Sequence, residues 1–353
     1  MTGSGARVAS PRTVLAGSGI AAIEYALPER VVTNDELDRL HPGWKMTEVA
    51  KRTGVFARHW CTPQETALDL AVTACERLKT RDPELLSRCD AILFCTQSPD
   101  QPMPPNACLL QDRLGLPSSI AALDFTLACS GFVYGLYLAN ALVVSGSARQ
   151  VLLVTAETYS KWMHPEDRGP ITLFGDGAAV TVLTPSSSAR IGQCALGTDG
   201  SGAPVFCVPA GGARNPRDAE TAVGRADMFG NIRSPENLLM NGRAVLDFVK
   251  QEIPTFVKTF LEQSGESIDS IDLVVFHQAS RLGLEYLDSA LAVPEAKRFS
   301  NLASIGNTVS ASIPIALRQA EEDGRLHPGM RVLLVGFGVG LSWGVSIITW
   351  GSP

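Results

Sequence analysis

The sequence predicts an α/β fold made of two duplicated halves. CDAILFCTQ (89–97) resembles IDLVVFHQ (271–278), and ARQVLLVTAE (148–157) resembles GMRVLLVGFG (329–338). The two pairs are offset by 182 and 181 residues. Two matches at nearly one offset indicate an internal repeat. Their short, continuous apolar runs are typical of strands that are buried on both faces of a sheet.

Helical segments fill the gaps between these runs. A helix is expected over 65–79 in the first half, and over 235–263 and 310–322 in the second half. The alternation of strands and helices predicts layered α/β packing. The repeat places the two halves at residues 18–185 and 186–353.

Each half is expected to end in a pair of strands that are joined by glycines. Phe174-Gly175-Asp176-Gly177 leads into a strand over 178–183, and Gly338 to Gly340 lead into a strand over 342–349. Equivalent loops of a duplicated fold meet at its pseudo-twofold axis. A site at that axis would draw residues from both halves.

Two stretches without charged residues, 125–148 and 332–350, are long enough to cross a membrane. The second contains four glycines and alternates as paired strands do. The first carries the polar residues Ser130, Asn140 and Ser145, which suits a helix buried in an α/β core. No membrane segment is therefore expected. Residues 1–17, rich in Gly, Ser and Ala, lack the apolar core of a secretory signal and are expected to form a flexible tail.

The composition excludes several classes of protein. Hydrophobic residues make up 45% and charged residues 19% of the chain, which is typical of a well-cored globular protein and not of a disordered one. The net charge of −6 argues against a nucleic-acid binder, so an anionic ligand needs a local basic patch. The eight cysteines form no C-x-x-C pair, which argues against a metal site and predicts a cytoplasmic protein with reduced thiols.

Cys129, in LACSGF (127–132), is the candidate nucleophile. Residues 124–128 indicate a strand end or turn, and Ser130 begins an apolar helical segment. Cys129 is therefore expected at a helix N-terminus, where the dipole and the free N–H groups favour a thiolate. The alternative is a structural cysteine in a packed helix.

Two further polar residues follow apolar runs. His277 comes directly after the strand 273–276, at the carboxyl end where α/β proteins place their sites. Asn307 precedes an apolar helix and, taken alone, could be a helix cap. The repeat offset makes that helix the counterpart of the helix after Cys129. The three side chains are therefore expected on converging loops.

Four segments together are similar to the signature of a known family. ACSGF (128–132), FHQAS (276–280), GNTVSASIP (306–314) and GFGVGLSWG (336–344) resemble those of β-ketoacyl-acyl carrier protein synthase III, of the thiolase superfamily. The likeness covers nearly the whole chain after the tail. It implies a thiolase-like fold with five α-β-α-β-α layers, usually in a homodimer.

The resemblance also implies a mechanism. Cys129 would take an acyl group as a thioester, and His277 and Asn307 would assist decarboxylative attack by malonyl-ACP or malonyl-CoA. A thiolate is both a nucleophile and a good leaving group, and two hydrogen-bond donors stabilise the enolate that forms when CO₂ leaves. The acyl oxyanion would be held by the backbone N–H groups of Cys129 and Val339, although the family often has Gly at position 339.

Two arginines match segments that bind the acyl donor in the family. Arg52 lies in KRTGVFARH (51–59) and Arg168 in HPEDRGPITLFGDGA (164–178). The resemblance implies that they bind phosphopantetheine or coenzyme A, and Arg suits phosphates and adenine. A surface ion pair is the alternative for each.

Other positions depart from the family pattern. Glu48 stands where the family has a stacking Trp, and Ser280 and Leu282 stand where it often has Asn and Arg. A carrier-protein donor is therefore as well supported as free coenzyme A. Met103 matches a position that is often a Phe reaching across the dimer, which predicts a pocket for something other than acetyl. Simple packing at the interface is the alternative.

The leading hypothesis is a decarboxylating ketosynthase of specialised metabolism. It would use acyl-CoA or acyl-ACP substrates, with no tightly bound cofactor and no nucleic acid or membrane as partner. An acyltransferase acting on a hydroxyl or amine would need Cys129 and His277 but no enolate-stabilising pair, so Asn307 favours condensation. Head-to-head condensation of two acyl thioesters stays open. A silent partner subunit and a cysteine hydrolase are weaker alternatives.

Overall fold

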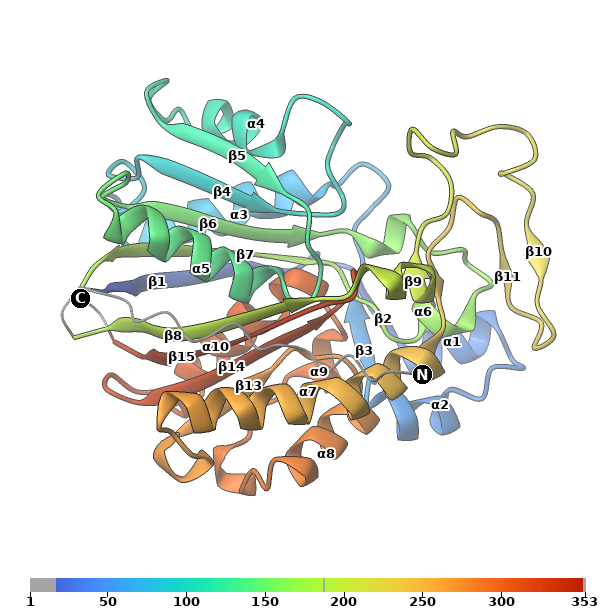
Figure 1. Ribbon diagram of the computed structural model, residues 1–353. Coiled ribbons are helices and arrows are strands. Elements are labelled where there is room, and N and C mark those ends of the chain that lie inside the picture. The colour runs from blue at the N-terminus through green and yellow to red at the C-terminus, as the bar shows by residue number, and fades with distance from the viewer. Residues whose placement is uncertain (1–16, 187, 352–353) are drawn as a thin grey trace.

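The computed structural model describes residues 17–186 and 188–351, which form two β-sheets separated and covered by helices (Figure 1). The first sheet has the order β1-β7-β6-β4-β5. Its strands are β1 (Ser18–Ala26), β4 (Ala91–Cys95), β5 (Ala121–Phe125), β6 (Val151–Glu157) and β7 (Gly177–Pro185).

The second sheet has the order β13-β14-β15-β8. Its strands are β8 (Arg190–Thr198), β13 (Leu273–Phe276), β14 (Arg331–Gly338) and β15 (Ser342–Thr349). The pairing repeats that of the first sheet: β4 and β13 lie parallel to β6 and β14, which lie antiparallel to β7 and β15. Strand β5 has no full counterpart, because only a single bridge between Val274 and Arg298 occupies that edge.

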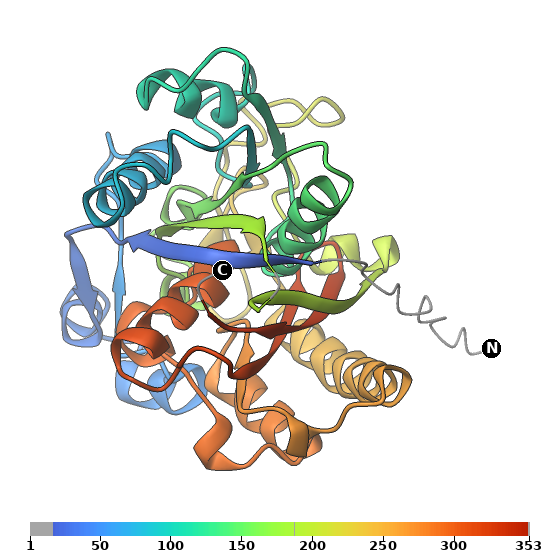
Figure 2. The ribbon, with the colours of Figure 1, turned by 90° about the vertical axis from the view of Figure 1, so that its left-hand side faces the viewer.

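Helices complete five layers, which Figure 2 shows from the side. Helices α3 and α4 cover the outer face of the first sheet, α5 and α10 lie between the sheets, and α7 and α8 cover the second sheet. The predicted five-layered α/β fold is confirmed. These helices are α3 (Ala67–Arg81), α4 (Asn106–Arg113), α5 (Gly131–Val144), α7 (Gly242–Ser264), α8 (Arg281–Ala290) and α10 (Ser312–Glu322).

Shorter elements gather at one end of the sheets, on the right in Figure 1. The short helices are α1 (Asn34–Leu40), α2 (Met46–Thr53), α6 (Arg168–Ile171) and α9 (Leu302–Ile305). The short strands are β2 (Val31–Thr33), β3 (Ala57–His59), β9 (Phe206–Cys207), β10 (Arg225–Ala226), β11 (Ile232–Arg233) and β12 (Leu239–Met240).

The central helix α5 is apolar because both sheets pack against it. Phe132, Leu136 and Ala139 are fully buried in the core that joins the two sheets. The one polar residue well inside the helix, Asn140, accepts hydrogen bonds from the backbone N–H and hydroxyl of Ser18. Within residues 17–186 and 188–351, no helix combines the length and apolar character that a membrane span requires.

Helix boundaries differ from the sequence predictions at three places. The helix expected from 65 begins at Ala67, because Thr66 and Asp69 form a capping box. The helix expected from 235 begins at Gly242, because the preceding residues form β12 against β9 and Asn241 caps the helix. A 3₁₀ turn occupies 309–311, so α10 begins at Ser312, 181 residues after the start of α5.

Two predictions concern the ends and the division of the chain. The predicted flexible tail, residues 1–17, lies outside the described residues except for Gly17. The predicted boundary at residues 185 and 186 falls between β7 and β8 and stays a prediction.

The central layer should carry much of the stability. Replacing Phe132, which is fully buried between the sheets, with Ala should lower the free energy of unfolding by about 3 to 5 kcal/mol, because it leaves a cavity. Leu40→Ala, at a position 62% exposed, should change it by about 0.5 kcal/mol or less. Denaturant unfolding measures both, and equal losses would contradict this assignment of the core.

Candidate active site

The structure brings Cys129, His277 and Asn307 into one cavity of about 650 Å³. Cys129 lies between β5 and α5, His277 directly follows β13, and Asn307 lies between α9 and the turn before α10. All three are buried, at 3%, 1% and 3% exposure. The two halves of the sequence therefore contribute to one site.

The turn after β14 packs directly on Cys129. A Cβ atom at Gly338 would come within 2.8 Å of the Cys129 sulfur, so only glycine fits at this position. The backbone N–H groups of Cys129 and Val339 both face that sulfur. These are the two groups that the resemblance implied for the oxyanion.

Asn307 and His277 form a pair with a defined orientation. The Asn307 Oδ1 accepts a hydrogen bond from the backbone N–H of Val309 (2.9 Å), which directs the amide nitrogen toward the His277 Nε2 at 3.3 Å. The other ring nitrogen, Nδ1, lies 2.7 Å from the hydroxyl of Ser312, which is fully buried. Burial lowers the pKa of His277 to about 3, so the imidazole is neutral at physiological pH.

The expectation that helix α5 favours a Cys129 thiolate is wrong in its net direction. Burial raises the pKa of the thiol, and the Glu157 carboxylate raises it further. The N–H groups of Cys129 and Val339 lower the pKa but do not offset burial. Cys129 also precedes the N-cap Ser130, one residue before the expected position. The resting Cys129 side chain is therefore a thiol.

Glu157 is a buried acid that the sequence analysis did not single out. It ends β6, is fully buried, and accepts hydrogen bonds from the backbone N–H of Gln97 (3.0 Å) and the hydroxyls of Ser98 (3.2 Å) and Ser310 (2.9 Å). Burial raises its pKa to about 8. The available signal was an acid at the carboxyl end of a buried strand.

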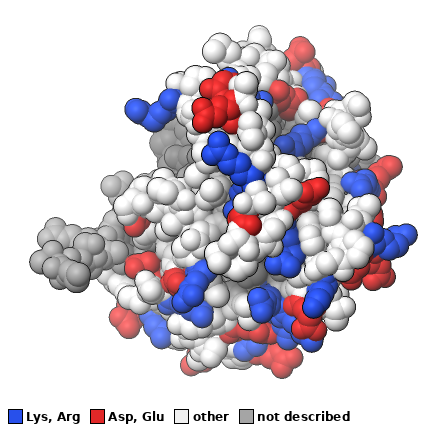
Figure 3. Space-filling view, turned by 90° about the vertical axis from the view of Figure 1, so that its right-hand side faces the viewer, with Lys and Arg blue, Asp and Glu red and all other residues white. Residues whose placement is uncertain are grey.

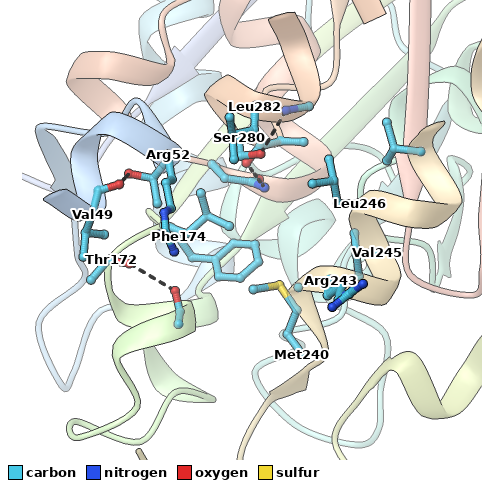
Figure 4. Close-up of a pocket in the computed structure, with 18 of the residues that line it drawn as sticks. Val49, Arg52, Thr172, Phe174, Met240, Arg243, Val245, Leu246, Ser280 and Leu282 are labelled. Atoms are coloured by element: carbon cyan, nitrogen blue, oxygen red, sulfur yellow. Dashed lines mark hydrogen bonds between the residues drawn. The ribbon is translucent and has the colours of Figure 1, made fainter. Parts of the chain in front are cut away.

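Cationic side chains line the cavity near its mouth. Arg52 and Arg168 both line it, and within the described chain neither guanidinium forms a hydrogen bond or ion pair. In Figure 4, Arg52 and Arg243 lie on opposite sides of the cavity. Figure 3 shows the side of the molecule that lies on the right in Figure 1. Lys and Arg side chains are grouped in its central and lower part, with Asp and Glu among and around them. Free cations beside a cavity suit an anionic ligand.

Three of the positions that depart from the family pattern, Glu48, Ser280 and Leu282, also line the cavity. Glu48 forms an ion pair with Lys51 (2.7 Å), and Ser280 caps α8 while Leu282 adds apolar surface. Trp44 lines the cavity too and stacks on His41 with ring centroids 3.9 Å apart.

Met103 is not brought into this cavity. It is 79% exposed, in the loop before α4. The described residues also contain no group of three or more His, Cys, Asp or Glu side chains placed to hold a metal ion.

Comparison with known proteins identifies the family. Residues 123–200 match the family described as 3-oxoacyl-[acyl-carrier-protein] synthase III, and residues 261–350 match its C-terminal region. A β-ketoacyl-[acyl-carrier-protein] synthase III from Streptomyces coelicolor is 36% identical over 94% of this chain and 97% of its own. One from Rhodopirellula baltica is 36% identical over 95% of this chain and 99% of its own.

This chain belongs to the β-ketoacyl-[acyl-carrier-protein] synthase III family. A solved 3-oxoacyl-(acyl-carrier-protein) synthase III superposes with a TM-score of 0.92 at 43% identity, covering 95% of this chain and all of that one. The family, the thiolase-like fold and the acyltransferase class predicted from the sequence are confirmed.

Glu157 gives the site a testable pH signature. The folded protein holds a proton on Glu157 up to about pH 8, whereas an unfolded carboxyl loses it near 4.5. The protonated Glu157 carboxyl therefore makes its full contribution to the free energy of unfolding below pH 4.5, and this contribution is lost as the pH rises toward 8. Glu157→Gln should therefore gain melting temperature relative to wild type as the pH rises from 5 to 8. Glu29→Gln, at an exposed position, is the control and should show no such gain. If the melting temperatures of Glu157→Gln and wild type changed in parallel with pH, the prediction would be contradicted.

Proposed function

We propose that this synthase III relative is a decarboxylating ketosynthase in which Cys129 carries the acyl group and His277 and Asn307 support the condensation. The observation that supports it is the meeting of two donor sets in one cavity. Two backbone N–H groups face the Cys129 sulfur, and the His277–Asn307 pair lies in the same cavity.

The first half-reaction is acyl transfer to Cys129. The sulfur attacks the carbonyl carbon of the donor thioester, a new C–S bond forms, and the bond to the carrier sulfur breaks. The N–H groups of Cys129 and Val339 stabilise the negative oxygen of the tetrahedral intermediate. The thiol must lose its proton during attack, and neutral His277 can take it and pass it to the leaving carrier thiol.

The second half-reaction forms the carbon–carbon bond. A malonyl thioester loses CO₂, and the enolate oxygen accepts hydrogen bonds from the Asn307 amide and the His277 Nε2–H. The enolate carbon attacks the Cys129 thioester and the Cys129 sulfur leaves. Nε2 is unprotonated when it acts as the base of the first half-reaction, so here His277 adopts its other neutral tautomer, with the proton on Nε2 and none on Nδ1. The Ser312 hydroxyl is placed to donate a hydrogen bond to the unprotonated Nδ1. Ser312 is thus a positioning residue for His277.

The oriented Asn307 amide favours condensation over simple acyl transfer. Transfer to a hydroxyl or amine develops no enolate, so it has no need of a second donor beside His277. The amide is held by Val309 so that its N–H groups face His277. Coenzyme A and acyl carrier protein both present a phosphopantetheine arm, and the unpaired Arg52 and Arg168 suit its phosphates.

A homodimer formed through β5 fits the exposed surface of the chain. β5 is an edge strand of the first sheet, and Leu123 on it is 46% exposed. An unpaired apolar edge strand is suited to pairing with a second copy. Met103 lies in the loop before α4, which packs on β5. A dimer of this kind would cover Met103 and place it toward the partner.

Intact-mass measurement separates the two half-reactions. Incubation with acyl-CoA and acyl-carrier donors should add one acyl group to wild type and none to Cys129→Ala. Asn307→Ala should still be acylated, but with malonyl thioester it should form product at least about 100-fold more slowly, because a donor to the enolate is lost. His327→Ala, at an exposed histidine, is the control. Undiminished condensation by Asn307→Ala would reject its role, and no adduct at all would favour a silent subunit.

The arginines should act on donor binding. Arg52→Ala and Arg168→Ala should each raise KM for the acyl donor about tenfold with little change in kcat, because a charge-assisted hydrogen bond is lost. Arg149→Ala, whose side chain is 94% exposed, should have no effect. Measuring KM with both acyl-CoA and acyl-carrier-protein donors shows which carrier is used. An unchanged KM for both donors would mean that these arginines are surface residues with no role in donor binding.

A further inference from the structure

A second cavity of about 570 Å³ adjoins the catalytic cavity. The turn after β14 separates them, because Gly338 lines the catalytic cavity while Val339 and Gly340 line the second one. Phe206 lines both cavities. The second cavity therefore begins at the turn whose Val339 N–H faces the Cys129 sulfur.

This position makes the second cavity the space available to the acyl chain. The carrier arm occupies the catalytic cavity, whose mouth is cationic, and the acyl oxygen faces the N–H groups of Cys129 and Val339. The remaining substituent of the acyl carbon must then extend along the turn. This placement of the acyl chain rests on the function proposed above. Which acyl groups the second cavity selects then depends on the residues that line it.

Gln97 supplies an oriented hydrogen-bond donor in this cavity. The buried Tyr159 donates its phenol O–H to the Gln97 Oε1, and Glu157 holds the Gln97 backbone N–H at 3.0 Å. The Gln97 Nε2 group, by contrast, has no hydrogen-bond partner within the described residues. The Thr126 hydroxyl also lines the cavity and likewise has no partner within residues 17–186 and 188–351.

The rest of the lining is apolar or already neutralised. Trp162, Phe206 and Leu238 supply apolar walls. Arg217 also lines the cavity, but its Nε lies 3.4 Å from a carboxylate oxygen of Glu236. The cavity therefore presents a neutral donor and no free cation. A pure hydrocarbon would strip water from the Gln97 amide without replacing its hydrogen bonds, which penalises binding.

We infer that this cavity selects an acyl group that carries a neutral hydrogen-bond-accepting oxygen, such as a keto, ether or hydroxyl oxygen, on an otherwise apolar chain or ring. The Gln97 Nε2–H is the donor to that oxygen, and the Tyr159 hydroxyl is the group that orients it. The Thr126 hydroxyl offers a second polar contact for such a substituent.

Competition between matched donors tests this inference. Wild-type protein is mixed with equal amounts of two coenzyme A thioesters of similar shape, and the Cys129 adducts are measured by intact mass at early times. One pair is 4-oxopentanoyl and 4-methylpentanoyl, and the other is 3-oxobutyryl and 3-methylbutyryl. In at least one pair the oxo member should be favoured about tenfold, the effect of one hydrogen bond in a partly desolvated site. Succinyl-CoA should compete poorly, because no free cation awaits its carboxylate.

Variants then assign the preference to the donor. Gln97→Leu should bring the ratio of oxo to methyl adducts to about one or below, and Tyr159→Phe, which keeps the ring, should reduce it. Gln263→Leu, at an exposed glutamine on α7, should keep the wild-type ratio. Equal or greater labelling by both methyl members in wild type overturns the inference while leaving the ketosynthase proposal intact, as does a preference that survives Gln97→Leu. Absence of any adduct overturns both.

Discussion

The close approach of β14 to the start of α5 is the constraint on which the site depends. A Cβ at Gly336 would lie 2.9 Å from the backbone oxygen of Cys129, and one at Gly338 would meet the Cys129 side chain. Just beyond, the hydroxyls of Ser130 and Ser342 form a buried hydrogen bond of 2.8 Å across the two halves. Two glycines in one strand, β14, therefore let the second half of the chain touch Cys129, the proposed nucleophile, in the first half. The same approach aims the Val339 N–H at the sulfur.

Burial decides the protonation state of every group around this contact. The Cys129 thiol and the Glu157 carboxyl have raised pKa values and His277 has a lowered one, each because the charged form is poorly solvated. The resting interior is therefore close to neutral. Its fixed N–H groups can then act on negative charge that develops only during the reaction, in a medium that screens it weakly. The cations lie farther out, where water still reaches them.

The turn after β14 also divides the available space by chemistry. On one side lie the proposed catalytic residues and the cations that suit a phosphate-bearing carrier. On the other side lie aromatic walls and the amide of Gln97. In the proposed reaction, one short backbone segment supplies an oxyanion donor and separates the carrier of the acyl group from the acyl group itself. Bulk at Val339, where the family often has Gly, lies on the acyl side of this division.

The sequence by itself was sufficient for the architecture and for the catalytic candidates. Buried strands and an apolar central helix leave patterns that can be read locally, and the 181-residue offset correctly related the starts of α5 and α10. The sequence also predicted Cys129, His277 and Asn307 as site residues, because each lies next to the end of a strand or the start of a helix that the apolar pattern shows. The start of α7 was missed, since the pairing of β12 with β9 involves residues more than thirty positions apart.

Only the tertiary structure decided how these groups behave. The direction of the Cys129 pKa shift is set by burial and by Glu157, and neither can be read from the residues next to the cysteine. The Tyr159–Gln97 pair joins loops that come after two different strands, β6 and β4. Electrostatics and hydrogen-bond orientation depend on distances through space, and the chain sets these only when residues that are far apart in the sequence pack together.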